Sequence, residues 1–197
     1  MFDFGSRLEQ LPRFKVETNP NDNTKTINWM PNGYAEVYAH ADPKSDYVRS
    51  SKIVHLATCE QSYALKVATM TSGEQLLSYN PGPWLHRKDS AYFFENIFLT
   101  SKFIFVNEQE SESLKSAGFY RNLEDLSYNE RQVFIITRGA NSTLLIANNK
   151  VQEVPTIPTN LVDESGAGDA FCSAFLWCFE NGFSFEDAVK YGNLLGS

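Results

Sequence analysis

The stretch KFIFVNEQESESLKSAG, residues 102 to 118, places an apolar run directly before a polar, helix-forming segment. Residues 103 to 106 are all apolar, which is typical of a strand that is covered on both faces of a sheet. Residues 108 to 118 favour a helix that Gly118 would end. A short buried strand followed at once by a helix predicts one unit of an α/β fold.

The same alternation extends outward from this unit in both directions. The other predicted strands cover 52–57, 75–80, 133–139, 143–148 and 150–155, and the other predicted helices cover 61–70, 88–99, 168–182 and 183–196. Strands that alternate with helices predict an α/β fold with a mostly parallel sheet and helices on both faces. The last two strands, 143–148 and 150–155, are expected to form a hairpin.

The first 50 residues follow a different pattern. Residues 24–30 and 34–40 are rich in Thr, Ile, Tyr and Val, and Asn32-Gly33 lies between them. Asn-Gly between two such runs is a strong signal for a β-hairpin. We therefore expect a small antiparallel sheet in residues 1–50 and a separate α/β domain in residues 51–197.

Composition limits the classes of function. A net charge of -7 over 197 residues argues against a nucleic-acid partner. Three cysteines without a CxxC pair argue against a disulfide framework or a zinc site. The N-terminus lacks the pattern of a signal peptide, and no apolar run reaches the roughly 18 residues of a membrane span. We expect a cytoplasmic protein without a membrane partner.

Polar residues end several of the predicted strands. They are Asn80, Asn107 with Glu110, and Thr137 with Gly139. Ligands of open α/β sheets bind beyond the carboxyl ends of the strands, so these residues are candidates for a binding site. Structural alternatives stay open: Asn107 and Glu110 would also suit a helix cap, Asn80 a turn before proline, and Thr137 an ordinary strand.

A second candidate site lies in VDESGAGDAF, residues 162 to 171, before a long apolar helix. The small residues 166–168 would let an anion approach the unpaired amides of the helix N-terminus. Asp169 would repel a phosphate, but it suits a base that takes a proton from an attacking hydroxyl. Alternatively, Ser165 or Asp163 caps the helix and Asp169 only favours its dipole.

These motifs together resemble the ribokinase-like, PfkB-type family of sugar and nucleoside kinases. VDESGAGDAF is similar to the DTxGAGD signature of that family, and residues 107–110 resemble its NxxE motif. IITRGANST, residues 135–143, resembles the end of its nucleotide-binding strand, and residues 79–84 resemble its Asn-Pro segment. The early hairpin resembles the β-sheet lid over the acceptor.

The resemblance implies a ribokinase-like three-layer sandwich with a small β-hairpin lid in residues 1–50 and a nucleotide-binding domain in residues 51–197. It also implies transfer of the γ-phosphoryl group of ATP to a hydroxyl of a small sugar or nucleoside. Asp169 would be the base, and the amides of Gly166, Ala167 and Gly168 would form the anion hole.

The resemblance assigns further roles around the nucleotide. The nucleotide-binding residues would be Thr137, Gly139, Asn107 and Glu110. Glu110 would act on Mg²⁺ indirectly, through the water shell that this ion retains. Asp163 and Asn80 are candidates for the substrate or for a monovalent cation such as K⁺.

The chain also departs from the family pattern. It begins near the lid, without the first strand–helix–strand unit, and it stops near the helix that leads to the adenine pocket. We expect a fragment of a longer protein whose lid edges would allow a homodimer. A non-catalytic pseudokinase or regulatory fragment is the alternative, and the choice between sugar and nucleoside stays open.

Overall fold

The strand predicted at residues 102–107 lies inside a six-stranded sheet with the order β3-β4-β5-β6-β7-β8. The computed structural model describes residues 14–18, 25–29, 42–71, 73–82, 85, 90–127, 131–159 and 165–197. The strands of this sheet are β3 (Ile53–Ala57), β4 (Leu76–Asn80), β5 (Phe103–Asn107), β6 (Val133–Thr137), β7 (Thr143–Ala147) and β8 (Lys150–Val154).

The first four strands of the sheet, β3 to β6, are parallel, and β7 and β8 are antiparallel to their neighbours. The β7–β8 turn is formed by Asn148 and Asn149, which have φ angles of 52° and 57°. Asparagine tolerates this left-handed conformation, which tight hairpin turns require. The predicted mostly parallel sheet and its terminal hairpin are therefore confirmed.

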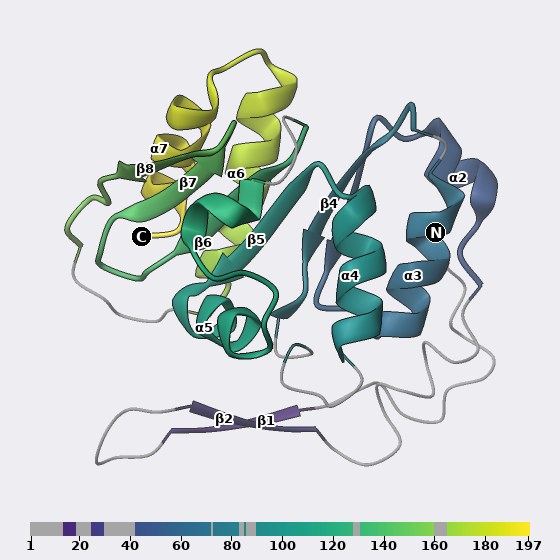
Figure 1. Cartoon of the computed structure of the whole chain (residues 1–197), viewed down its shortest axis with the longest axis horizontal. Coiled ribbons are helices and arrows are strands. Elements are labelled where there is room, and N and C mark those ends of the chain that lie inside the picture. Colours follow the sequence, from purple (N-terminus) through teal and green to yellow (C-terminus); the bar gives the residue numbers. More distant parts are fainter. Residues whose placement is uncertain are drawn as a thin grey trace.

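Helices cover both faces of the sheet (Figure 1). The helices are α2 (Ser45–Ser50), α3 (Gln61–Met70), α4 (Ser90–Thr100), α5 (Glu108–Ser116), α6 (Ala167–Glu180) and α7 (Phe185–Leu195), with a 3-10 turn, η2 (Leu123–Ser127). Residues of α3, α4 and α5 share one apolar core, and residues of α6 and α7 share the other. This arrangement is the expected three-layer sandwich.

Alternation along β5 shows how one strand serves both cores. Ile104 and Val106 belong to the core beneath α3, α4 and α5, whereas Phe103 and Phe105 belong to the core beneath α6 and α7. Successive side chains of a strand point to opposite faces, so a fully apolar strand must be covered twice. The uninterrupted apolar run in the sequence reflects this double burial.

Aromatic rings fill the core beneath α6 and α7. Phe103 is fully buried, and its ring centre lies 5.3 Å from Phe175, 4.7 Å from Phe179 and 6.1 Å from Phe185. All three pairs meet edge to face, the arrangement that aromatic quadrupoles favour. This cluster attaches both helices to the middle of the sheet.

A separate two-stranded sheet precedes the main one (Figure 1). Its strands, β1 (Phe14–Thr18) and β2 (Lys25–Trp29), are antiparallel. The strand predicted at 24–30 is thus confirmed, while the partner strand at 14–18 was not predicted. The other half of the expected hairpin, 34–40, lies outside the described residues. The division into two domains stays a prediction.

Among the helices that the structure describes, none has the length and apolar character needed to cross a bilayer.

Candidate active site at the carboxyl ends of the strands

Three predicted site residues end neighbouring parallel strands: Asn80 ends β4, Asn107 ends β5 and Thr137 ends β6. Asn107 and Thr137 are direct partners in the register of β5 and β6. Parallel strands place their carboxyl ends on one edge of the sheet, where α/β proteins bind ligands. The structure therefore brings these residues to a common edge, as the sequence predicted.

Asn107 and Glu110 form a capping box at the start of α5. The Asn107 Oδ1 atom accepts a hydrogen bond from the Glu110 amide at 2.8 Å, and Glu110 Oε2 accepts one from the Asn107 amide at 2.9 Å. Only 7% of Glu110 is exposed. The capping role that the sequence left open is thus present, and it fixes the Glu110 carboxylate at the edge of the sheet.

Asn80 connects the end of β4 to α6. Its Oδ1 atom accepts a hydrogen bond from the Gly82 amide at 3.2 Å, which closes a tight turn. Its Nδ2 atom lies 3.9 Å from the Cys172 sulfur, a distance for a weak hydrogen bond to sulfur. The amide oxygen of Asn80 therefore has the turn-forming role that the sequence left open. Its amide nitrogen faces α6, the helix that carries Asp169.

The start of α6 differs from the starts of α3, α5 and α7. Side chains of Glu60, Asn107 and Ser184 cap those three helices, whereas the N-cap of α6 is Gly166, without a capping side chain. Gly166 has a φ angle of 83°, a left-handed conformation that glycine adopts without a steric cost. The N-cap position therefore falls on Gly166 and not on Ser165, whereas Asp163 lies outside the described residues.

The first turn of α6 presents its backbone amides together with a carboxylate. The amides of Ala167, Gly168 and Asp169 precede the first amide that donates within the helix, which is that of Ala170, bonded to the Gly166 carbonyl at 2.9 Å. Asp169 lies in this turn and is exposed. The arrangement can stabilise an anion with the amides while the carboxylate accepts a proton from a neighbouring hydroxyl.

The charges of one carboxylate on α5 and one on α6 both act on the Cys172 thiol. Burial raises the pKa of the Cys172 thiol to about 12, against the hydrogen bond from Asn80, and the charges of Asp169 and Glu110 add to the rise. Two carboxylates from different helices thus act on one thiol. Cys172 is therefore in contact with Asn80 and feels the charges of both Glu110 and Asp169.

The charge of Asp169 also acts on His55, on β3. Its Nδ1 atom is 2.8 Å from the Ser78 hydroxyl, and its ring meets Phe105 edge to face at 6.2 Å. Burial lowers the pKa of His55, and the charge of Asp169 partly opposes this shift. Sequence reasoning did not select His55, because a single histidine in an apolar strand gives no signal of its neighbours.

The β6 end carries the remaining predicted residues. Thr137 Oγ1 lies 3.5 Å from the Val106 carbonyl, and Gly139 has a φ angle of 57° in the following turn. Arg138 is held by the hairpin, since its Nε donates to the Ser142 carbonyl at 2.6 Å. Asp163 lies outside the described residues. Thr137 and Gly139 thus border the same edge of the sheet as Asn107.

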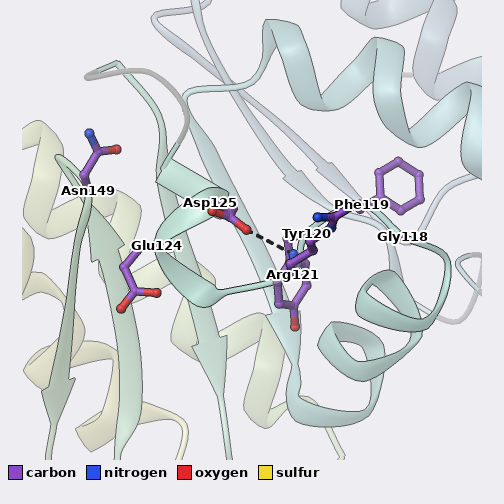
Figure 2. A pocket seen from close by; sticks show the side chains of 7 residues that line it. All are labelled: Gly118, Phe119, Tyr120, Arg121, Glu124, Asp125 and Asn149. Carbon is purple, nitrogen blue, oxygen red and sulfur yellow. Dashed lines mark hydrogen bonds between the residues drawn. The ribbon is translucent and has the colours of Figure 1, made fainter.

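A shallow cavity of about 610 Å³ lies elsewhere, between the segment after α5 and the β7–β8 turn (Figure 2). Its lining includes Arg121, Asp125 and Asn149. Asn149 follows Ala147, the register partner of Val133 at the amino end of β6. This cavity therefore opens at the end of the sheet opposite to the site described above.

No group of three or more His, Cys, Asp or Glu side chains could hold a metal ion, within the part of the chain that the structure describes. A metal cage made of protein ligands alone is therefore absent from these residues. Glu110 remains suited to an indirect role, because a magnesium ion keeps several of its waters.

Because two of its thiols are buried, we expect the folded protein to lose stability at alkaline pH. Burial raises the pKa of both Cys59 and Cys172 from an ordinary value near 9 to about 12. The folded state therefore holds these protons more tightly, and stability that is complete below pH 9 is lost as the pH rises toward 12. From pH 8 to 10, urea unfolding should show a loss of unfolding free energy about 3 kcal/mol greater in the wild type than in Cys59→Ala/Cys172→Ala. Equal losses in both proteins would contradict the burial of these thiols.

Comparisons with known proteins agree with the fold. The model of the pfkB family carbohydrate kinase matches residues 13–197. A nucleoside kinase of Methanocaldococcus jannaschii is 30% identical over 189 residues, which cover 95% of this chain and 60% of that protein. A nucleoside kinase of Methanothermobacter thermautotrophicus is 23% identical and is covered to the same 60%.

Solved structures give the same picture. The crystal structure of the M. jannaschii nucleoside kinase, an archaeal member of the ribokinase family, superposes with a TM-score of 0.79 at 26% identity, over 94% of this chain and 60% of that one. The Burkholderia thailandensis nucleoside kinase in complex with inosine has a TM-score of 0.76 at 18% identity, with the same coverage. The chain thus spans about 60% of the length of these relatives.

Proposed function

Because the chain belongs to the pfkB family of carbohydrate kinases, we propose that it carries the phosphoryl-transfer site of an ATP-dependent nucleoside kinase. The γ-phosphoryl group of ATP is transferred to a hydroxyl of the acceptor. Nucleoside is favoured over sugar as acceptor because the two relatives described above are nucleoside kinases. A small sugar is the second acceptor class.

The observation that carries this proposal is the first turn of α6. Its N-cap is a left-handed glycine, which has no side chain to cap the amides, and Asp169 is exposed beside them. A carboxylate next to an anion site opposes simple phosphate binding, because the two charges repel each other. The combination suits a reaction in which the carboxylate takes a proton while the amides hold the transferring phosphoryl group.

The proposed mechanism is a single in-line displacement. The acceptor hydroxyl gives its proton to Asp169, and its oxygen forms a bond to the γ-phosphorus as the bond to the ADP oxygen breaks. The amides of Ala167, Gly168 and Asp169 stabilise the charge on the transferring group. Thr137 and Gly139, at the end of β6, border the nucleotide.

Magnesium would supply charge neutralisation at the phosphates when it is bound. Glu110 fits an indirect contact, since its largely buried carboxylate is fixed by the capping box at the edge of the sheet. Asn107 orients Glu110 through the same pair of hydrogen bonds. Asp163 stays a candidate for a monovalent cation such as K⁺, and Asn80 for the substrate.

The test is transfer of a labelled γ-phosphoryl group from MgATP to a panel of nucleosides and small sugars. We expect a labelled nucleoside monophosphate and the release of ADP. A labelled sugar phosphate would support the second acceptor class. Binding of MgATP without transfer to any acceptor would support the pseudokinase alternative, and absence of both would contradict the proposal.

Two substitutions of Asn107 can separate its capping of α5 from its proposed role at the magnesium waters. Serine also caps helices well, so Asn107→Ser should leave the free energy of unfolding within about 0.5 kcal/mol of the wild type, whereas Asn107→Ala should lose about 1 kcal/mol. If the amide also helps to organise the magnesium waters, both variants should weaken MgATP binding. Urea unfolding and calorimetric titration measure the two effects. Unchanged MgATP affinity in Asn107→Ser would reduce Asn107 to a cap.

A further inference from the structure

The end of α7 packs unusually close to the first turn of α6. A Cβ atom added at Gly196 would lie 2.9 Å from the Ala167 carbonyl oxygen, and one added at Gly192 would lie 2.7 Å from the Phe171 ring. Real Cβ atoms are not found at such distances from carbonyl oxygens or carbon atoms. Both contacts fall on the helix turns that carry Asp169, which lies between residues 167 and 171 of α6.

Backbone conformation does not explain these two glycines. Neither Gly192 nor Gly196 is among the glycines with a positive φ angle. Gly192 lies inside α7, where alanine would be more favourable by about 1 kcal/mol in intrinsic helix propensity. The absence of a side chain therefore serves the close approach of the two helices.

Buried hydrogen bonds fix α7 to the sheet beside these glycines. Asn193 is only 6% exposed, and its Oδ1 atom accepts a hydrogen bond from Thr143 Oγ1 at 2.6 Å. Its Nδ2 atom donates to the Pro155 carbonyl at 3.0 Å. Thr143 begins β7 and Pro155 follows β8, so the end of α7 is held at the edge of the sheet where β6 ends.

Phe171 transmits the position of α7 to the centre of the sheet. Its ring lies against Gly192 on one side and meets Phe105 of β5 edge to face at 6.1 Å. Phe171 is two residues after Asp169, in the same helix. The first two turns of α6 are thus held between α7 and β5, with Gly196 touching the backbone of the turn itself.

We propose that Gly192 and Gly196 are positioning residues for the anion-binding turn. By allowing α7 to seat directly against residues 167 and 171, they fix the amides of the turn and the direction of Asp169. The inference rests on the proposed function for its catalytic meaning. The geometric part, that these glycines set the position of the α6 N-terminus, stands independently.

The experiment compares the wild type with Gly196→Ala, Gly192→Ala and the control Leu195→Ala. Leu195 adjoins Gly196 but is 61% exposed, so its truncation leaves the α6–α7 contact in place. Hydrogen exchange of the amides 170–173, the first that are bonded within α6, is measured without ligand, and the affinity for MgATP is measured by calorimetry. In both glycine variants the added methyl group should displace the first turn of α6 by about 1 Å. This displacement should increase the exchange of these amides and weaken MgATP binding by about tenfold or more.

A second substitution, at Phe171, allows the inference to be tested even if a glycine variant folds poorly. The ring that clashes in Gly192→Ala is removed in the double variant Gly192→Ala/Phe171→Leu, which should recover slow exchange at 170–173 and most of the MgATP affinity. Wild-type exchange and affinity in Gly196→Ala and Gly192→Ala, or no recovery in the double variant, would overturn the inference. A wild type that does not bind MgATP would contradict the proposed function, while the exchange data would still decide the positioning role.

Discussion

Asp169→Asn should lower the rate of phosphoryl transfer by about a hundred- to ten-thousandfold, the range expected when a general base is removed. Asparagine keeps the size of the side chain but does not accept the proton of the acceptor hydroxyl. The first-turn amides of α6 are unchanged, so the affinity for MgATP should stay within about threefold of the wild type. Single-turnover transfer and calorimetric titration measure the two quantities.

The matched control is Asp187→Asn. Asp187 is an exposed acid in the first turn of α7, as Asp169 is in α6, but its carboxylate is bonded to Ser184 and Lys190. Its neutralisation should leave the transfer rate unchanged. Wild-type turnover in Asp169→Asn, or an equal loss in Asp187→Asn, would remove Asp169 from the role of base.

Phe103→Ala should reduce the free energy of unfolding by about 3–5 kcal/mol, the range for deleting a fully buried phenylalanine. Phe103 is completely buried, and its ring contacts rings from both α6 and α7. The cavity would therefore open between the sheet and the helix pair that carries the candidate site. Urea unfolding followed by circular dichroism provides the measurement.

Leu99→Ala is the control for this substitution. Leu99 lies on α4 and is 59% exposed, so its loss should change stability by less than about 0.5 kcal/mol. A loss below about 1 kcal/mol in Phe103→Ala would mean that the aromatic cluster does not attach α6 and α7 to the sheet.

Local patterns in the sequence predicted the main sheet and its helices. The apolar run at 103–106 and the polar run after it correspond to β5 and α5, and the alternation elsewhere gave the remaining strands of that sheet in order. The strand ends at Asn80, Asn107 and Thr137 followed from the same patterns, because polar residues interrupt apolar runs where the chain leaves the core. Their meeting at one edge then follows from parallel pairing.

Features that depend on distant contacts were not predictable in this way. The pairing of β2 with residues 14–18 depends on a register that no local signal specifies, and the six-residue α2 is too short for a periodic pattern. The contact of Asn80 with Cys172, 92 positions later, likewise appears only after folding. Two roles were left open for Glu110, and its capping bond required the geometry of α5.

The most direct test of the central claim is a hydrogen-exchange map of the chain with and without a non-hydrolysable MgATP analogue. We expect slower exchange at amides 167–170, at the start of α6, and at 137–142, from the end of β6 onward, because both segments border the strand ends. Protection confined to residues 118–125, beside the cavity at the opposite end of the sheet, or no protection at saturating analogue, would contradict the claim that this edge is a phosphoryl-transfer site.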